Sequence, residues 1–530
     1  MATNWQTFPI EFKGGLISNM SPLQQGINAI GSATILQNFE PARSGGYSKI
    51  RGYSKVETTV VPGSGRVLGV KVVKPSEFIV ARSNGSVTEY HKTTGAGWTS
   101  LGTTSLLGNK IRSTEFNFGT GDFIYFVDSI NYPALYNDTT GTLSFVTSSA
   151  DLQGAEQVAI FKNTVFFSKG SNLYFSAPGN PNDFTPVNGG GAINVSHEIT
   201  GLISFRDQLI IFSRNKIQRI TGSTISDFQL NPITESIGCL DPDTIQEVGG
   251  DIMYMSPDGI RLLGATDRIG DFALEVASDP IADDVYRFAQ STSNFCSIVI
   301  REKAQYRIFA YTESEQAKVA RGLLVTKFSD QGAANLAWGE TSGIKAFVAD
   351  SKYVDNYSEI IVFANEDGYL YQMEQGANFD GEAIEAIYES PYMPVTDPQV
   401  RKTFYKLTTY IDPQGSFEID LAVKYDFTRS NNQNLIQPAA TTISSSGLSV
   451  FYYGNVTSVF GTSTYGGELD KVYQNQIIGS GKVIAIRIED NSTNPGFTLD
   501  TALLEYTQND RQEGKKHGRL HTPRYGKQHC

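Results

Sequence analysis

Histidine, the residue most often used for acid–base catalysis near neutral pH, is scarce in this 530-residue chain. The five histidines are His91, His197, His517, His521 and His529. None belongs to an HExxH zinc motif, and the sequence has no GxSxG nucleophile elbow and no glycine-rich lysine loop for phosphates. His197 precedes Glu198 and offers half of a catalytic pair, but a lone polar histidine in a loop is more often structural. The sequence therefore predicts no catalytic or cofactor-binding residues, and we expect a protein that is not an enzyme.

Two clusters of aspartate offer oxygen ligands for a hard cation such as calcium. Asp241 and Asp243 lie two positions apart, and Asp283 and Asp284 close a second cluster that begins at Asp279. Neither cluster has the spacing of an EF-hand loop, with its central glycine and final glutamate. Asx-turns and helix caps explain both clusters more simply, so no metal site is expected.

Activity on glycans is the alternative that the sequence leaves open. The stretch Ser329-Asp330-Gln331-Gly332, followed by Trp338, compares with the Asp-box turn of sialidases, but its spacing differs and it occurs once. That turn is a fold element remote from the chemistry. Glycoside hydrolysis needs two positioned carboxyl groups, and 55 acidic residues offer too many pairs to choose from. Trp5, Trp98 and Trp338 are too scattered to predict a sugar platform.

The three cysteines, Cys239, Cys296 and Cys530, show no CxxC spacing and no even framework. Neither a structural zinc nor a disulfide scaffold is therefore expected. The N-terminus lacks a basic region followed by an apolar core, and no stretch approaches about 18 consecutive apolar residues. We expect a chain made and kept in cytoplasm, without a membrane span.

A short sequence pattern recurs seven times, and we expect it to form the scaffold of the fold. Each copy has three or four bulky apolar residues, a small polar turn and a second strand-like run, as in Val165 to Phe175. The first runs end at Ala81, Val127, Ser168, Ser213, Ser256, Tyr311 and Ala364, which are 41 to 55 residues apart. Hairpin sheets repeated at this period stack radially, so we expect a β-propeller of about seven blades, with six to eight allowed.

The bulk composition agrees with an all-β fold. The chain has 51 glycines, 40% hydrophobic residues and 11% aromatic residues, and its one helical pattern lies near Pro280 to Ala289. Lys plus Arg number 43 against 55 Asp plus Glu, a net charge of -12, which disfavours an ordinary duplex-binding surface.

Four segments are expected along the chain. An extended N-terminal arm covers residues 1–62, the propeller covers 63–376, and a β-sandwich covers 377–510. A polar insertion at 428–479 interrupts the sandwich, and a basic tail covers 511–530. The arm either packs on the propeller, closes its last blade or reaches a neighbouring subunit. The strand candidates of the sandwich are Ile384 to Tyr388, Lys402 to Ile411, Phe417 to Tyr425, Leu448 to Tyr453, Lys482 to Glu489 and Phe497 to Tyr506.

Three pieces of sequence resemble one protein family. The first comprises Phe12-Lys13-Gly14-Gly15-Leu16, Gln37-Asn38-Phe39-Glu40 and Ser44 to Tyr53. The second is the strand and proline-rich loop from Leu173 to Phe184, and the third joins Arg401 to Lys406 with Leu504 to Arg511. In this order they resemble the tail nozzle and tail hub proteins (tail tubular protein B-like) of short-tailed bacteriophages. The insertion and the tail do not match the family.

The resemblance implies a structural virion protein of the phage tail, assembled in host cytoplasm. Such proteins typically form a ring of six copies below the portal and adaptor, with tail fibre or spike proteins as further partners. The ring is a conduit and closure for genome DNA during ejection. A net negative charge suits a wall that DNA must slide past, so we expect acidic residues to outnumber basic ones on the lumen face.

Overall fold

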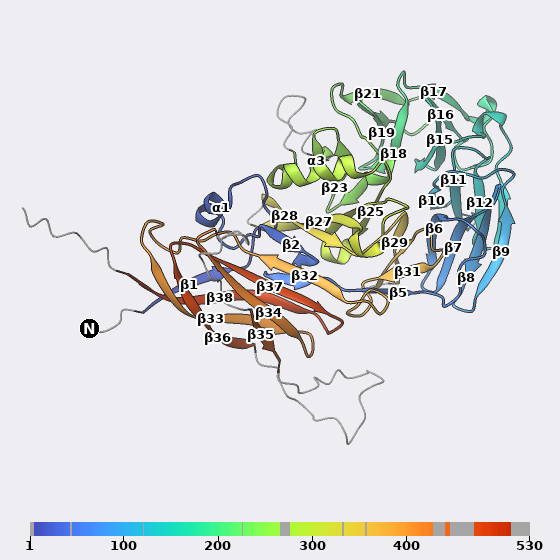
Figure 1. Ribbon diagram of the computed structural model, residues 1–530. Helices are drawn as coiled ribbons and strands as arrows, with labels where there is room; N and C mark the ends of the chain where they lie inside the picture. Colours follow the sequence, from blue (N-terminus) through green and yellow to red (C-terminus); the bar gives the residue numbers. More distant parts are fainter. Residues whose placement is uncertain are drawn as a thin grey trace, which may run out of the picture.

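The computed structural model describes residues 5–42, 45–119, 121–224, 226–264, 276–330, 333–355, 358–427, 440–445 and 471–509. Strands dominate this part of the chain, and its two α-helices are α1 (Pro22–Asn28) and α3 (Ala282–Ser291). Figure 1 shows many small sheets at one end of the molecule and a pair of larger sheets at the other. The fold is therefore all-β, as the composition predicts. No helix in the described ranges is long and apolar enough to cross a membrane.

Seven antiparallel sheets follow one another along the chain, and we number them first to seventh. The first two contain β6 (Val67–Lys74), β7 (Glu77–Asn84), β8 (Val87–Thr93) and β9 (Trp98–Thr103), then β10 (Arg112–Asn117), β11 (Asp122–Val127), β12 (Ala134–Asn137) and β13 (Thr142–Phe145). The third and fourth contain β14 (Gln157–Phe161), β15 (Thr164–Lys169), β16 (Asn172–Phe175) and β17 (Gly191–Asn194), then β18 (Ile199–Phe205), β19 (Gln208–Ser213), β20 (Ile217–Thr221) and β21 (Gln229–Thr234).

The remaining sheets are less uniform. The fifth contains three strands, β22 (Gln246–Val248), β23 (Asp251–Ser256) and β24 (Gly259–Leu262). The sixth contains β25 (Phe295–Ile300), β26 (Gln305–Ala310), β27 (Arg321–Asp330) and β28 (Ala333–Ser342). The seventh contains β29 (Val348–Asp355), β30 (Ser358–Ala364), β31 (Leu370–Met373) and, from far upstream, β5 (Tyr53–Lys55).

The seven predicted repeats coincide with these seven sheets. Six of the anchor positions, from Ala81 to Ala364, lie on the second strand of successive sheets, and Tyr311 directly follows β26. Aromatic and branched residues fill the spaces between neighbouring sheets: Phe167 packs between the second and third, and Phe212 between the fourth and fifth. The first and seventh sheets share a core that includes Val80 and Val362, and β29 lies beside β6. The last sheet therefore packs on the first.

Two larger sheets face each other at the other end of the molecule (Figure 1). One has the order β3 (Phe39–Pro41), β4 (Tyr47–Lys49), β38 (Phe497–Gln508), β33 (Lys402–Pro413) and β36 (Val472–Gly481), and β1 (Gln6–Glu11) also pairs with β38. The other continues the sixth sheet through β2 (Ile35–Gln37), β32 (Ile384–Glu389), β37 (Ile484–Ser492), β34 (Glu418–Tyr425) and β35 (Thr441–Ser444). Leu407 and Leu504 of the first sheet share a core with Ile486 of the second.

The first 62 residues do not form a separate extended arm, in contrast to the expected division. β1, β3 and β4 belong to the facing sheets, β2 joins β28 to β32, and β5 completes the seventh sheet. These strands are only three to six residues long, so their sequences carry little periodicity, and β1, β2, β4 and β5 have partners hundreds of residues away. Of the alternatives for the arm, the structure shows packing on both parts of the molecule and pairing with the last of the seven sheets.

The polar insertion is also partly strand. Within the expected span of 428–479, β35 pairs with β34 and most of β36 pairs with β33. The sequence did not predict these strands, because polar residues such as Gln474 and Gln476 lie on the exposed side of an edge strand and interrupt the apolar pattern. The strand candidate from Leu448 to Tyr453 and the tail 511–530 lie outside the described residues.

Candidate functional site at the centre of the seven sheets

The first strands of several sheets lie side by side, since β29 contacts β6 and β25, and β14 contacts β10 and β18. Several carry a charged residue among apolar neighbours, as does Lys71 between Val70 and Val72 on β6. Glu115 lies on β10, and Asp350 and Lys352 lie on β29. Because alternate residues of these strands point to the same side, the four charges converge.

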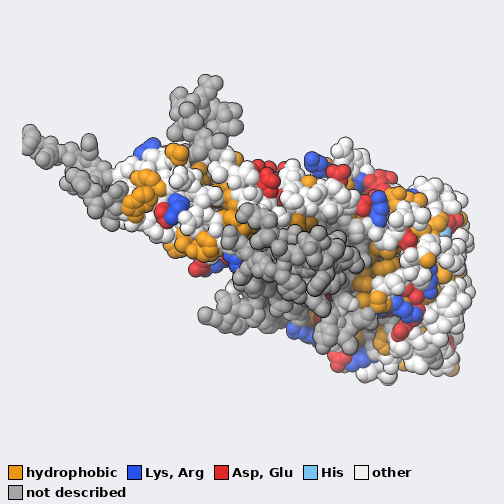
Figure 2. All heavy atoms as spheres, turned by 90° about the horizontal axis from the view of Figure 1, so that it is seen from below, with side chains coloured by type: hydrophobic (Ala, Val, Ile, Leu, Met, Phe, Trp, Pro, Cys, Tyr) orange, Lys and Arg blue, Asp and Glu red, His pale blue; other side chains and the backbone are white. Residues whose placement is uncertain are grey.

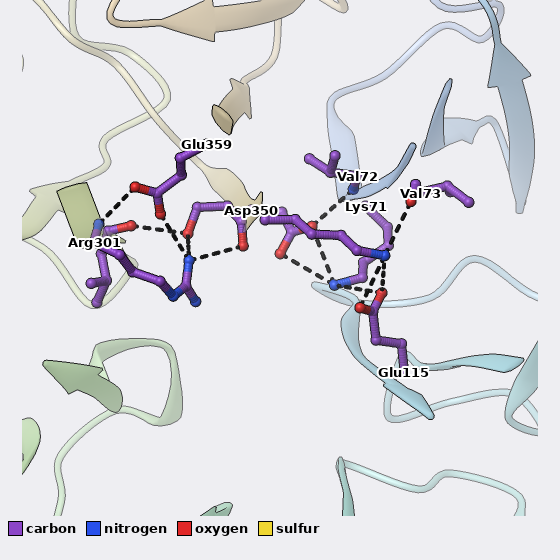
Figure 3. Close-up of polar contacts among 10 residues, drawn as sticks. Lys71, Val72, Val73, Glu115, Arg301, Asp350 and Glu359 are labelled. Carbon is purple, nitrogen blue, oxygen red and sulfur yellow. Dashed lines mark hydrogen bonds and ion pairs between the residues drawn. The ribbon is translucent and has the colours of Figure 1, made fainter. Parts of the chain in front are cut away.

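These four residues, which we call the central tetrad, form alternating ion pairs (Figure 3). Lys71 Nζ lies 3.3 Å from Asp350 Oδ2 and 3.5 Å from Glu115 Oε2. Lys352 Nζ lies 3.0 Å from Glu115 Oε1 and donates to the carbonyl oxygen of Val73. The backbone N–H of Val72 donates to Asp350 Oδ2 at 2.8 Å. The tetrad thus joins the seventh, first and second sheets.

The charges of the central tetrad balance one another. Burial alone would lower the pKa of Lys71, but the carboxylates of Asp350 and Glu115 outweigh it and raise that pKa. Lys71 therefore stays charged over the physiological range. Beside the tetrad, Arg301 Nη1 lies 2.9 Å from Glu359 Oε1 and 2.9 Å from Ser351 Oγ, which ties the sixth sheet to the seventh (Figure 3).

A second group of charges, the axial cluster, links sheets that are not neighbours in sequence order. It consists of Lys110, Arg112, Asp241 and Asp243. The guanidinium of Arg112 binds Asp243 through two hydrogen bonds of 2.8 and 3.0 Å, and Lys110 Nζ lies 3.1 Å from Asp243 Oδ2. Lys110 also donates to the carbonyl oxygen of Phe295 at 2.6 Å. The cluster therefore connects the second, fifth and sixth sheets.

The two aspartates of the axial cluster have opposite electrostatic environments. Burial would raise the pKa of Asp243, but Arg112 and Lys110 lower it to about 2. Burial and the charge of Asp243 raise the pKa of Asp241 to about 6. The Asp243 N–H donates to Asp241 Oδ1 at 2.8 Å, which is the Asx-turn arrangement expected from the sequence.

A third charge group, the bridging tetrad, lies where the N-terminal strands meet the sixth sheet. Arg307 Nη2 lies 3.0 Å from Glu40 Oε2 and 2.8 Å from Glu374 Oε1. Lys303 Nζ lies 2.5 Å from an oxygen of each carboxylate. Arg307 is fully buried. The tetrad ties β3 to β26 and to the residue that follows β31.

The structure does not bring the histidine candidates into a site. His197 and Glu198 are both exposed in the turn between β17 and β18. His91 is buried in β8 and pairs with Glu89 at 3.3 Å. His517, His521, His529 and Cys530 lie outside the described residues.

The carboxylate and tryptophan candidates have local partners. Asp283 and Asp284 occupy the first turn of α3, and Asp284 pairs with Arg287 at 3.0 Å. Trp338 is buried and its Nε1–H donates to the carbonyl oxygen of Ala277, while Trp5 lies on the ring of Tyr405. Of the Asp-box stretch, Ser329 and Asp330 end β27, and Gln331 and Gly332 lie outside the described residues. The described residues contain no group of three or more histidine, cysteine or acidic side chains that could hold a metal ion.

Two buried thiols lie near the axial cluster. Burial raises the pKa of Cys239 and of Cys296 to about 12, so neither side chain is a thiolate nucleophile at neutral pH. The central and bridging tetrads were not predicted from the sequence. A lone charged residue inside an apolar strand, such as Lys71, is the signal that could have predicted the central tetrad.

Comparisons with known proteins do not assign a family. No family model matches the chain, and no curated protein matches it. A solved structure from B. thetaiotaomicron, the extracellular domain of a protein described as a hybrid two component system, has a TM-score of 0.38 and 9% identity, covering 61% of this chain and 42% of that one. A second extracellular domain from B. thetaiotaomicron, of a one component system, has a TM-score of 0.37 and 10% identity, covering 67% and 43%. An exo-beta-1,3-galactanase from Phanerochaete chrysosporium has a TM-score of 0.26 and 9% identity, covering 86% and 100%.

Proposed function

We propose that this protein is a structural component of a short-tailed phage virion, the nozzle at the distal end of the tail. In this proposal the seven sheets are the blades of a β-propeller and the facing sheets are its accompanying sandwich. Six copies form a ring below the portal and adaptor, and the genome passes along the ring axis during ejection. Tail fibre or spike proteins bind to the outside.

The observation that carries the proposal is the way the N-terminal strands unite the molecule. The stretches that resemble the phage family include Gln37 to Glu40 and Ser44 to Tyr53, and these hold β3, β4 and the start of β5. Through them the chain links the facing sheets to the seven smaller sheets, while Glu40 anchors the bridging tetrad. A wall built this way resists deformation, as a pressurised conduit requires.

The central charges support a path for DNA between copies rather than through one chain. Lys71 and Lys352 each bind a carboxylate of another sheet, and Arg112 binds Asp243 ahead of the fifth sheet, so ion pairs tie these sheets together where DNA would have to pass between them. On the face shown in Figure 2, acidic and basic side chains are interspersed. We expect acidic residues to outnumber basic ones along the axis of the ring.

Electron microscopy of the purified chain and of the virion tests the proposal. A six-membered ring on the tail axis is the expected result, and a monomer that binds sugar would contradict it. Deleting residues 511–530 tests the tail separately. If the ring still forms and still binds the adaptor, the tail is not a docking element.

One observation favours the second candidate, a glycosidase or lectin for host-surface glycans. The raised pKa of Asp241 beside the lowered pKa of Asp243 is the pattern of an acid and a nucleophile. However, the Asp243 carboxylate already forms ion pairs with Arg112 and Lys110. Loss of a measured glycan cleavage in Asp241→Asn, with a cooperative melting curve that shows the variant is folded, would favour the enzyme.

A further inference from the structure

A lysine and an aspartate form a fully buried pair between the two facing sheets. Lys49 ends β4 and Asp490 lies in β37, so the two residues belong to opposite sheets. Lys49 Nζ lies 2.8 Å from Asp490 Oδ2, and the side chains are 1% and 0% exposed. The pair thus spans the core that holds the facing sheets together.

The surroundings solvate these two charges poorly. Lys49 lies opposite Phe39 of β3, whose ring packs edge to face on Phe497 at 5.8 Å. Apart from Asp490, the ammonium donates to the carbonyl oxygen of Ser492 at 3.2 Å. Asp490 Oδ1 is buried and has no hydrogen-bond partner among the described residues. A buried ion pair with unfilled hydrogen-bond positions is poorly compensated for its lost hydration.

We propose that Lys49 and Asp490 condense to form an intramolecular isopeptide bond. In the first step a proton passes from Nζ to Oδ2, which leaves an amine beside a carboxylic acid. The nitrogen lone pair then forms the Nζ–Cγ bond and the Cγ–Oδ2 bond breaks. Oδ2 leaves as water with the proton it holds and a second proton from nitrogen. One ammonium and one carboxylate become one secondary amide and one water, with no change of oxidation state.

The product fits the site better than the ion pair does. The amide keeps a single N–H, and the carbonyl oxygen of Ser492 is already placed to accept it. Both charges disappear from the core. The bond would join positions 441 residues apart and would tie the N-terminal strands covalently to β37. A cross-link that closes so long a loop strongly restricts the unfolded chain.

Other lysine–carboxylate pairs of the described chain differ from this one. Lys71 lies between two carboxylates and is 10% exposed, and its partner Asp350 is 19% exposed. Lys303 likewise lies between two carboxylates and is 28% exposed. Lys49 and Asp490 combine one-to-one pairing with complete burial, which brings one nitrogen to one carboxyl group.

Intact-mass spectrometry of the purified full-length chain under denaturing conditions tests the proposal. The main species should be lighter than the sequence mass by one water molecule. Proteolysis and fragmentation should then yield a branched peptide that contains both Lys49 and Asp490. Lys49→Arg keeps the positive charge but cannot form this bond, and Lys49→Arg and Asp490→Ala should both show the full sequence mass. Lys71→Arg, the matched control, should keep the loss of water.

Two results would overturn the isopeptide bond. One is a wild-type chain at the full sequence mass after prolonged incubation of the folded protein. The other is a loss of water that maps elsewhere, for example to an aspartimide. The measurement requires neither a ring nor a virion, so its outcome is independent of the proposed tail function.

Discussion

The bridging tetrad and the central tetrad have the same composition, two carboxylates and two cations, but different surroundings. The carboxylates of the bridging tetrad, Glu40 and Glu374, are 8% and 13% exposed, whereas those of the central tetrad, Asp350 and Glu115, are 19% and 34% exposed. Water and salt therefore screen the central carboxylates more than they screen the bridging ones. The comparison predicts that burial, rather than the number of ion pairs, decides how much stability depends on each residue.

The largest expected effect is that of Arg307→Met. The substitution leaves Glu40 and Glu374 as neighbouring buried carboxylates with Lys303 alone to neutralise them. Removing one partner of a buried ion pair typically costs about 3–5 kcal/mol of unfolding free energy. Urea unfolding measures this value. The control is Arg206→Met, because Arg206 is 64% exposed, and a loss of equal size in both variants would contradict the comparison.

Lowering the pH is expected to change the stability of the bridging tetrad and of the axial cluster in opposite directions. Burial would raise the pKa of Glu374, but Arg307 and Lys303 lower it, so the bridging tetrad is fully stabilising above about pH 4.5 and loses stability as pH falls further. The pKa of Asp241 is raised from 3.8 to about 6, so the axial cluster gains stability as pH falls from 7 to 5.

Asp241→Asn isolates this second effect. At pH 7.5 the variant should be more stable than the wild type by about 1–3 kcal/mol, because it lacks the charge that burial and Asp243 disfavour. Melting temperatures from pH 5 to pH 8 measure the difference. An identical pH slope in both proteins would show that Asp241 is not responsible.

A smaller loss is expected for Asp350→Asn in the central tetrad. The amide oxygen still accepts from Val72, and Lys71 keeps Glu115, so the cost should be about 1–2 kcal/mol. The cost should shrink when sodium chloride is raised to about 1 M, since salt screens partly exposed charges more than fully buried ones. A cost as large as that of Arg307→Met, and insensitive to salt, would show that the two tetrads are equivalent.

The smallest effect should come from Asp207→Asn. Asp207 is 84% exposed and pairs with Lys162 at 2.6 Å, and exposed ion pairs of this kind contribute about 0–1 kcal/mol. Chemical denaturation of this variant sets the baseline for the other three. A loss above about 2 kcal/mol would mean that exposure is a poor guide to the energetics of this chain.

The sequence predicted the repeated hairpins well because each copy is local. Val165 to Phe175 contains two paired strands and the turn between them, so its pattern is complete within a dozen residues. β2 and β5 could not be predicted in this way. Each has three residues, and each exists only because a distant strand pairs with it, β32 in one case and β31 in the other.

The central tetrad could not be predicted from the sequence for the same reason. Lys71 and Asp350 are 279 residues apart and meet only after the first and seventh sheets have packed together. In contrast, the Asx-turn between Asp241 and Asp243 is local and was expected from the sequence. The contact of Asp243 with Arg112 joins residues 131 positions apart and was not expected from the sequence.

The N-terminal strands also determine when the chain can finish folding during synthesis. Residues of β1 leave the ribosome almost 500 residues before their partner β38, and β5 has no partner strand until β31 emerges. Until then these strands have unpaired edges that can pair with other nascent chains. Premature termination before β38 would therefore release a product with its first strand unmatched, and chaperones that hold nascent chains should bind the segment around Gln6–Glu11.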